Sequence, residues 1–150
     1  MSKSFWPWLV RASLLSGLCA EAGCATWGMQ ITLRGDAETN SGRPLTVLVR
    51  SLPLSQYRSE SYSDVSQLSL QPDQSVVRAL TLEPREHFTR RLQVRVPSKT
   101  PVAIYFLYTS QTGSWKMILQ PPLPWSVRIP LGRRGVLVDD VTECRFLRDL

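Results

Sequence analysis

Short apolar runs separated by turn residues dominate this chain from residue 30 onward, and this pattern constrains the fold more than any other feature. About eight such runs occur, with turn signals roughly every 8–12 residues, which is typical of an all-β sandwich. Most of the 11 prolines follow residue 40, and proline disrupts helix interiors. Because the connections are short enough for antiparallel pairing, we expect a two-sheet antiparallel sandwich.

The expected strands share alternating or strongly apolar character, and they cover residues 30–34, 46–52, 76–82, 88–96, 102–108, 115–119, 127–129 and 136–138. The run 102–108 is the most apolar, which favours a central strand. A hairpin turn is expected at residues 132–135, where glycines flank two arginines. The final residues, 141–150, are expected to form a tail that is either a short helix or frayed.

A serine-rich segment, residues 55–71, interrupts the strand pattern. Tyr62, Val65 and Leu68 are spaced by three residues, which allows a short helix to pack one edge on a sheet. Ser63-Asp64 is a plausible cap for this helix. We therefore expect a small helical insertion in the sandwich.

The N-terminal residues have the pattern of an export signal. Lys3 and Arg11 give the first residues the character of a basic n-region, and the small or apolar run 12–20 follows it. This run fits an h-region of ~7–15 residues and is too short for a transmembrane helix, which needs ~20 residues. The alternative interpretation is a buried N-terminal helix.

The end of this N-terminal segment is compatible with three ways of processing the export signal. Ala22-Gly23-Cys24 resembles the end of a bacterial lipobox, although Glu21 stands where the motif prefers an aliphatic residue. Cys19 is a second candidate for acylation, and ordinary cleavage after Ala22 is a third outcome. We expect lipidation at Cys24, with Cys19 as the alternative. The expected organisation is then a signal peptide at 1–23, a β-sandwich domain at 24–140 and the tail at 141–150.

The third cysteine, Cys144, lies near the C-terminus. If neither early cysteine is lipidated, a Cys24–Cys144 disulfide becomes possible in an oxidising compartment. Metal binding through sulfur and nitrogen is not expected, because the chain has no C-x-x-C and His87 is its single histidine.

The charge of +6 does not indicate a nucleic-acid partner. Removal of residues 1–23 takes away two basic residues and one acidic residue, which lowers this charge to +5. No block of five like charges occurs, and no DNA- or RNA-reading motif accompanies the basic residues. Arginines such as Arg34, Arg50 and Arg95 fall within the apolar runs, which favours an interpretation as the solvated faces of strands.

The inventory of chemically competent residues argues against an enzyme. A hydrolytic triad needs a base, and His87 lies in a turn before a strand, where we interpret it as a surface histidine. The P-loop, dinucleotide and Gly-x-Ser-x-Gly motifs are absent from the sequence. Asp36, Glu38 and Asn40 have a calcium-loop spacing without the required glycine and glutamate, and Asp139-Asp140 is interpreted as a solvated strand end. We expect no catalysis, no cofactor and no metal.

The large aromatic residues are expected to form the sandwich core rather than a platform for carbohydrate, because large aromatics dominate cores. They are Tyr105, Phe106, Tyr108, Trp115 and Trp125.

The order of these features resembles the outer-membrane lipoprotein family of type VI secretion (TssJ/SciN-like). The similarity covers roughly residues 15–140, and the order of features is what identifies it. These features are the lipobox-like end at 22–24, the first strand at 31–34, the loop 40–44, the strand 45–52, the tyrosine-containing insertion at 57–70, and Tyr105–Tyr108 followed by Trp115-Lys116. The imperfect lipobox and the arginine-containing tail depart from the family pattern.

The resemblance implies a transthyretin-like (Ig-like) β-sandwich, anchored by lipid on the periplasmic face of the bacterial outer membrane. It implies a structural, non-catalytic role in the secretion membrane complex, in which the domain binds the periplasmic domain of an inner-membrane TssM-type protein. The family uses the loop between the first two strands for this contact. Carried over to this chain, the candidate partner-binding residues are Asp36, Glu38, Asn40, Ser41, Arg43 and Pro44. The alternative function is a periplasmic or secreted sandwich that binds a small ligand or carbohydrate.

Overall fold

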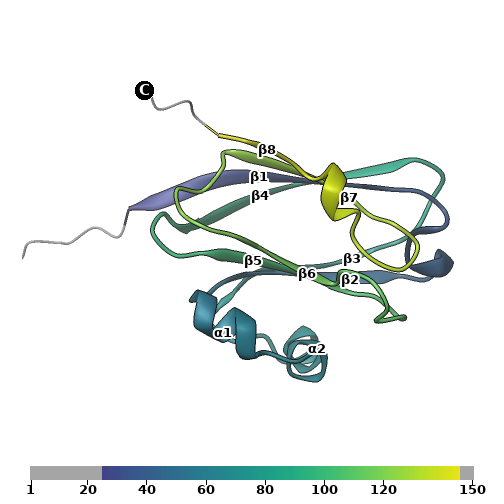
Figure 1. The fold of residues 1–150 in the computed structure, drawn as a ribbon, viewed down its shortest axis with the longest axis horizontal. Helices are drawn as coiled ribbons and strands as arrows, with labels where there is room; N and C mark the ends of the chain where they lie inside the picture. The colour runs from purple at the N-terminus through teal and green to yellow at the C-terminus, as the bar shows by residue number, and fades with distance from the viewer. Residues whose placement is uncertain (1–24, 146–150) are drawn as a thin grey trace, which may run out of the picture.

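Two four-stranded sheets pack face to face in the computed structural model, which describes residues 25–145 (Figure 1). The first sheet, called sheet A here, has the order β4-β1-β7-β8, and sheet B has the order β3-β2-β5-β6. The strands are β1 (Thr26–Gly35), β2 (Leu45–Ser51), β3 (Val76–Leu82), β4 (Phe88–Pro97), β5 (Val102–Leu107), β6 (Lys116–Leu119), β7 (Ser126–Pro130) and β8 (Thr142–Cys144). The helices are α1 (Leu54–Ser59) and α2 (Tyr62–Leu70), with short 3-10 segments η1 (Thr39–Gly42) and η2 (Val138–Asp140). The predicted β-sandwich with a small helical insertion is confirmed.

The main core lies between the two sheets. Alternate residues of β1 point inward, so Met29, Ile31 and Leu33 are fully buried while their neighbours face outward. Strand β5 is buried along almost its whole length and lies between β2 and β6, which confirms it as a central strand. The inner face of β5 contributes to the main core, and its outer face packs under the helices.

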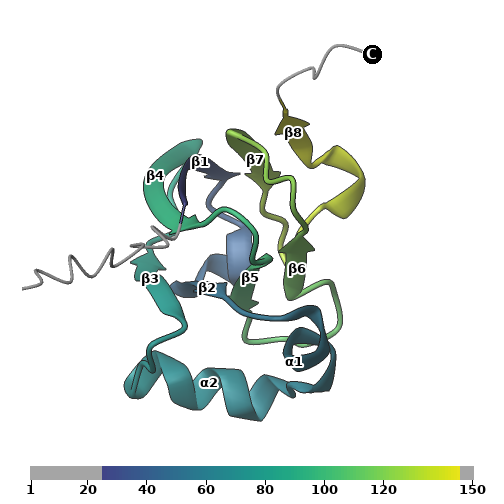
Figure 2. The ribbon, with the colours of Figure 1, turned by 90° about the vertical axis from the view of Figure 1, so that its left-hand side faces the viewer.

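The two helices cover the outer face of sheet B, as the end-on view in Figure 2 shows. Val65 of α2 is buried in a second apolar cluster with Leu48, Leu52 and Tyr105. The N-cap of α2 is Ser61, two residues before the predicted Ser63, and Asp64 of the predicted pair completes the cap. The Ser61 hydroxyl accepts from the Asp64 N–H, and the Asp64 carboxylate accepts from the Ser61 N–H. The Ser61 hydroxyl also donates to the Asp64 carboxylate at 2.7 Å, and this hydrogen bond, together with that from the Ser61 N–H, holds the pKa of Asp64 below its ordinary value.

Two strand predictions were wrong in ways that affect the fold. Strand β1 pairs with β7 in parallel, so the sandwich is not wholly antiparallel. Residues 136–138 do not form a strand: Val136 makes one isolated bridge to Leu131, and η2 begins at Val138. The eighth strand is β8, which pairs with β7 and extends the sandwich beyond the predicted boundary at 140. A three-residue polar strand has too few residues to display an alternating pattern.

Two side chains, those of Arg50 and Trp125, differ in burial from what their residue types predict. Arg50 is completely buried rather than on a solvated strand face. Tyr105, Phe106 and Tyr108 are buried as expected, and Trp115 is half-buried, but Trp125 is 44% exposed because it precedes β7 at the end of the sandwich. The expected signal segment, Cys19 and Cys24 lie outside the described residues. Within residues 25–145, no helix is long and apolar enough to cross a bilayer.

Candidate functional site

The loop between β1 and β2, residues 36–44, lies at the opposite end of the sandwich from residue 25 (Figure 1). Strand β1 has 10 residues, and a strand rises ~3.3 Å per residue, so the two ends are roughly 30 Å apart. The chain thus enters the sandwich at one end and presents this loop at the other.

Asn40 holds the loop in shape. Its side-chain Nδ2 donates to the carbonyl oxygens of Arg43 at 3.3 Å and Pro44 at 2.8 Å, and its Oδ1 accepts from the Thr109 N–H at 2.8 Å. The residue is 1% exposed. Asn40 therefore organises the loop from inside and does not present its side chain to a partner, which corrects the expectation that Asn40 is a contact residue.

The backbone of the loop is also specialised. Asn40, Ser41 and Gly42 have positive φ values of 51°, 55° and 75°, a left-handed conformation that asparagine and glycine tolerate best. Just before the loop, a Cβ atom on Gly35 would lie 2.5 Å from Thr39 Oγ1 and 2.6 Å from the Phe88 ring. The glycine lets the loop close against β4.

A second loop, residues 131–137, is bound to the first. Thr39 Oγ1 donates to the Leu131 carbonyl at 3.4 Å, and the Asn40 N–H donates to the Gly132 carbonyl at 3.4 Å. Arg133 forms an exposed ion pair with Glu38 at 3.7 Å. The parallel pairing of β1 with β7 brings the carboxyl ends of these strands together, and the two loops leave from those ends.

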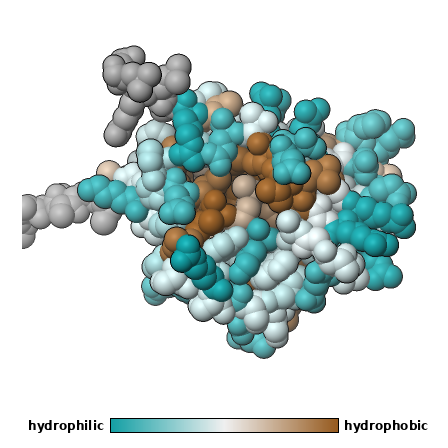
Figure 3. All heavy atoms as spheres, viewed as in Figure 1, coloured by the Kyte–Doolittle hydropathy of each residue, from teal (hydrophilic) through white to brown (hydrophobic). Residues whose placement is uncertain are grey.

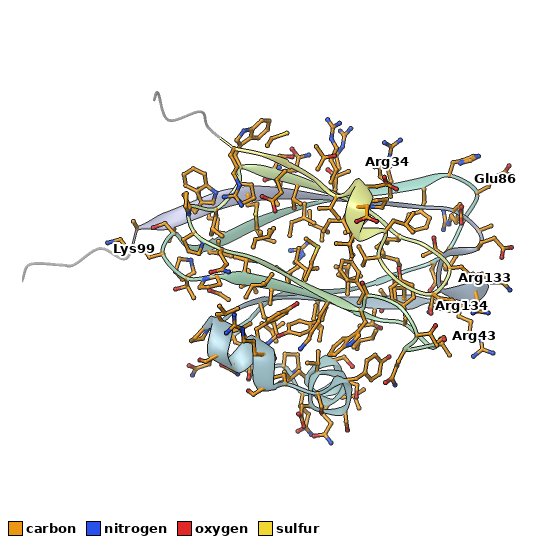
Figure 4. All side chains as sticks on the ribbon, viewed as in Figure 1. Arg34, Arg43, Glu86, Lys99, Arg133 and Arg134 are labelled. Atoms are coloured by element: carbon orange, nitrogen blue, oxygen red, sulfur yellow. The ribbon has the colours of Figure 1, made fainter. Side chains whose placement is uncertain are left out.

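The β5–β6 connection completes this end of the molecule. The Val136 N–H donates to the Ser114 carbonyl at 2.8 Å, and a Cβ atom on Gly113 would lie 2.6 Å from the Arg134 carbonyl oxygen. Figure 4 shows Arg43, Arg133, Arg134 and Glu86 at this end, and Lys99 at the other. The loop end is defined here as the exposed side chains of residues 36–44 together with Arg133 and Arg134.

The predicted contact residues fall into two groups. Asp36, Glu38, Ser41, Arg43 and Pro44 are exposed, whereas Asn40 is buried. Asp36 also turns the chain, because its carboxylate accepts from the Glu38 N–H at 2.8 Å. Sequence reasoning missed the neighbouring Arg133 and Arg134, which were assigned only to a hairpin turn.

The arrangement supports binding and offers little chemistry. His87 is exposed in the β3–β4 turn, as expected for a surface histidine. Across residues 25–145, no three His, Cys, Asp or Glu side chains gather in a way that could hold a metal ion. Cys144 is half-buried at the end of β8.

Comparison with known proteins identifies the family. A family model described as "IglE, N-terminal domain" matches residues 46–131. A search of the curated proteins found no match.

Three solved structures have the same fold. The type VI secretion lipoprotein TssJ1 from Pseudomonas aeruginosa has a TM-score of 0.60 and 15% identity, covering 81% of this chain and 99% of that one. Lip from Serratia marcescens, a membrane-bound component of the type VI secretion system, has a TM-score of 0.54 and 14% identity, covering 73% and 95%. A chain from a structure of the TssM C-terminal domain from EAEC has a TM-score of 0.57 and 9% identity, covering 73% and 94%.

Because the family model spans more than half of the chain, this protein belongs to the family of the IglE N-terminal domain, and it has the β-sandwich fold of the TssJ-type lipoproteins of type VI secretion.

Proposed function

We propose that this protein is a structural, non-catalytic lipoprotein of a type VI secretion membrane complex. The family match and the fold shared with TssJ1 and Lip support this role. The proposed location is the periplasmic face of the outer membrane, with the lipid on Cys24, or alternatively on Cys19. The proposed partner is the periplasmic domain of an inner-membrane TssM-type protein.

The single observation that carries the proposal is a hydrogen-bonded loop placed at the opposite end of the sandwich from residue 25. Residue 25 begins the described chain at one end of β1, and residues 36–44 form the loop end at the other. A lipid on Cys24 would hold the first end at the outer membrane and direct the loop end into the periplasm. Rigid scaffolds commonly present binding loops in this way.

Exposed Arg43 is the residue in the loop best suited to test this contact, because arginine is enriched in protein interfaces and its side chain forms no ion pair within residues 25–145. We expect Arg43→Glu to weaken capture by an immobilised TssM-type periplasmic domain by about tenfold or more, the effect of about 1.4 kcal/mol. The melting temperature should not change, because the side chain is exposed.

The matched control is Arg58→Glu, which makes the same charge change on α1, where Arg58 is also exposed. This variant should bind like the wild type. Equal binding by the Arg43 and Arg58 variants would remove Arg43 from the contact.

Cys24→Ser tests the anchor separately. A single acyl chain contributes ~0.8 kcal/mol per buried CH₂, so loss of the acylated residue should move the protein from the membrane fraction to the soluble periplasmic fraction. Cys19→Ser is the control and should remain in the membrane. Retention of Cys24→Ser together with release of Cys19→Ser would transfer the assignment to Cys19.

A further inference from the structure

Among residues 25–145, the outer face of sheet A carries arginines and no acidic residue. Side chains point outward at alternate positions of β4, β1, β7 and β8, and these positions follow from the register. The outward residues are Thr89, Arg91, Gln93, Arg95, Gly28, Gln30, Thr32, Arg34, Ser126, Arg128, Pro130, Thr142 and Cys144. Figure 4 shows Arg34 pointing away from the second sheet, and the corresponding upper margin of Figure 3 is largely hydrophilic.

Three of these arginines surround one hollow. Arg34, Arg91 and Arg128 line a depression of about 560 Å³ together with Gln30, Thr32 and Ser126. Thr32 is only 8% exposed and lies between Arg91 and Arg128 in the register, so it forms the floor. The hollow therefore has a basic rim and a neutral, hydrogen-bonding floor.

The guanidinium groups of Arg34, Arg91 and Arg128 form no ion pair with any other residue of the described range. Within residues 25–145, the arginines that form ion pairs are Arg50, Arg133 and Arg145. Guanidinium groups stay charged at all ordinary pH values, and three of them line the same hollow. An anion in the hollow would form charge-assisted, bidentate hydrogen bonds with them.

The spacing fits an extended acidic segment. Neighbouring strands lie ~4.8 Å apart, so the Cα atoms of Arg91 and Arg128 are roughly 10 Å apart across Thr32. Arg34 is two residues further along β1, a rise of roughly 7 Å. Carboxylates on alternate residues of an extended chain repeat at the same interval of roughly 7 Å. A flat bilayer surface cannot follow a hollow whose floor is Thr32, whereas a peptide can enter it.

We propose that the hollow lined by Arg34, Arg91 and Arg128 on the outer face of sheet A is a docking surface for an extended acidic segment of a partner protein. This surface is distinct from the loop end, and the proposal does not depend on a TssM-type partner. The uncharged Gln30, Thr32 and Ser126 side chains supply hydrogen bonds between the charged contacts.

The test is fluorescence anisotropy of a dye-labelled peptide of alternating Glu and Thr, titrated with the full-length chain at physiological ionic strength, where the Debye length is ~8 Å. The wild-type chain should bind this peptide and should not bind a matched peptide of alternating Gln and Thr. The triple variant Arg34→Gln, Arg91→Gln, Arg128→Gln should lose affinity by about tenfold or more, because three charge-assisted contacts disappear.

The matched control is the triple variant Arg58→Gln, Arg78→Gln, Arg85→Gln, which removes the same charge from exposed arginines elsewhere. It should bind the acidic peptide within about twofold of the wild type, since remote charges are screened. Backbone amide NMR shifts at Gln30, Thr32 and Ser126 should move on binding.

Three results would overturn the proposal. One is absence of peptide binding by the wild-type chain. Another is an equal loss of affinity in both triple variants, which would show a dependence on net charge alone. The third is binding to phosphatidylglycerol vesicles that depends on Arg34, Arg91 and Arg128 and is not competed by the acidic peptide, which would assign the face to a membrane.

Discussion

At the scale of single residues, Asn40 explains why the loop end has a defined shape. A carboxamide is both a hydrogen-bond donor and an acceptor, and Asn40 uses both functions: it donates to two carbonyls within its own loop and accepts from the Thr109 N–H of the neighbouring loop. Its positive φ is also one that asparagine tolerates better than most residues. The residue joins two loops that are distant in sequence.

We expect Asn40→Ala to lower the free energy of unfolding by about 2–3 kcal/mol, because three part-buried backbone groups lose their hydrogen-bond partner. Ser41→Ala is the control, since Ser41 also has a positive φ but is exposed. It should change stability by less than about 0.5 kcal/mol. Urea unfolding monitored by tryptophan fluorescence measures both variants, and similar losses in the two would assign the effect to backbone conformation instead.

At the scale of elements, a buried polar cluster fastens the helices to sheet B. Arg50 of β2 donates to Glu60 at 2.6 Å and to Ser75 Oγ at 2.8 Å. Glu60, just after α1, also accepts from the Tyr105 hydroxyl at 2.6 Å. Burial and the hydrogen bond to Glu60 raise the pKa of Tyr105 above its ordinary value. The helical insertion is therefore attached to sheet B by an ion pair and hydrogen bonds as well as by apolar contacts.

Nearby, Lys116 of β6 donates to the backbone carbonyls of Tyr57 and Glu60, and its ammonium group lies 4.6 Å from the Tyr57 ring centroid. This contact ties α1 to the edge strand of sheet B. The insertion is consequently attached at both β2 and β6.

We expect Arg50→Ala to destabilise the protein by about 3–5 kcal/mol, because removal of one partner leaves a largely buried Glu60 carboxylate without its counter-charge. Arg78→Ala on β3 is the matched control, since Arg78 is exposed, and it should stay within about 0.5 kcal/mol of the wild type. Thermal and urea unfolding provide the measurement. A loss below about 1 kcal/mol for Arg50→Ala would mean that apolar packing alone attaches the helices.

At the scale of the whole molecule, the sequence predicts the two-sheet architecture better than it predicts which strands pair. Alternation and apolar runs predict the bounds of β2, β3 and β4 to within one residue. The predicted first strand, 30–34, misses residues 26–29 of β1. The parallel β1–β7 pairing is non-local and leaves no periodic signal in either strand. That pairing is what places Arg133 beside Glu38, so the full loop end could not be derived from sequence.

Residue type predicts the exposure of polar side chains correctly at some positions and wrongly at others. An arginine within a strand usually faces solvent, and Arg34, Arg91 and Arg128 do. Arg50 has the same local pattern but is buried, because the helical insertion covers the outer face of sheet B at that point. Asn40 is buried for a comparable reason, since the loops that cover it come from distant parts of the chain.

The loop end, and not the end near residue 25, is the proposed contact with a TssM-type periplasmic domain. Site-specific photo-crosslinking tests it most directly, with a photoreactive residue in place of exposed Ala37 at the loop end or exposed Lys99 at the opposite end. We predict a crosslinked product from position 37 and none from position 99. A product from position 99 with none from position 37 would contradict the account.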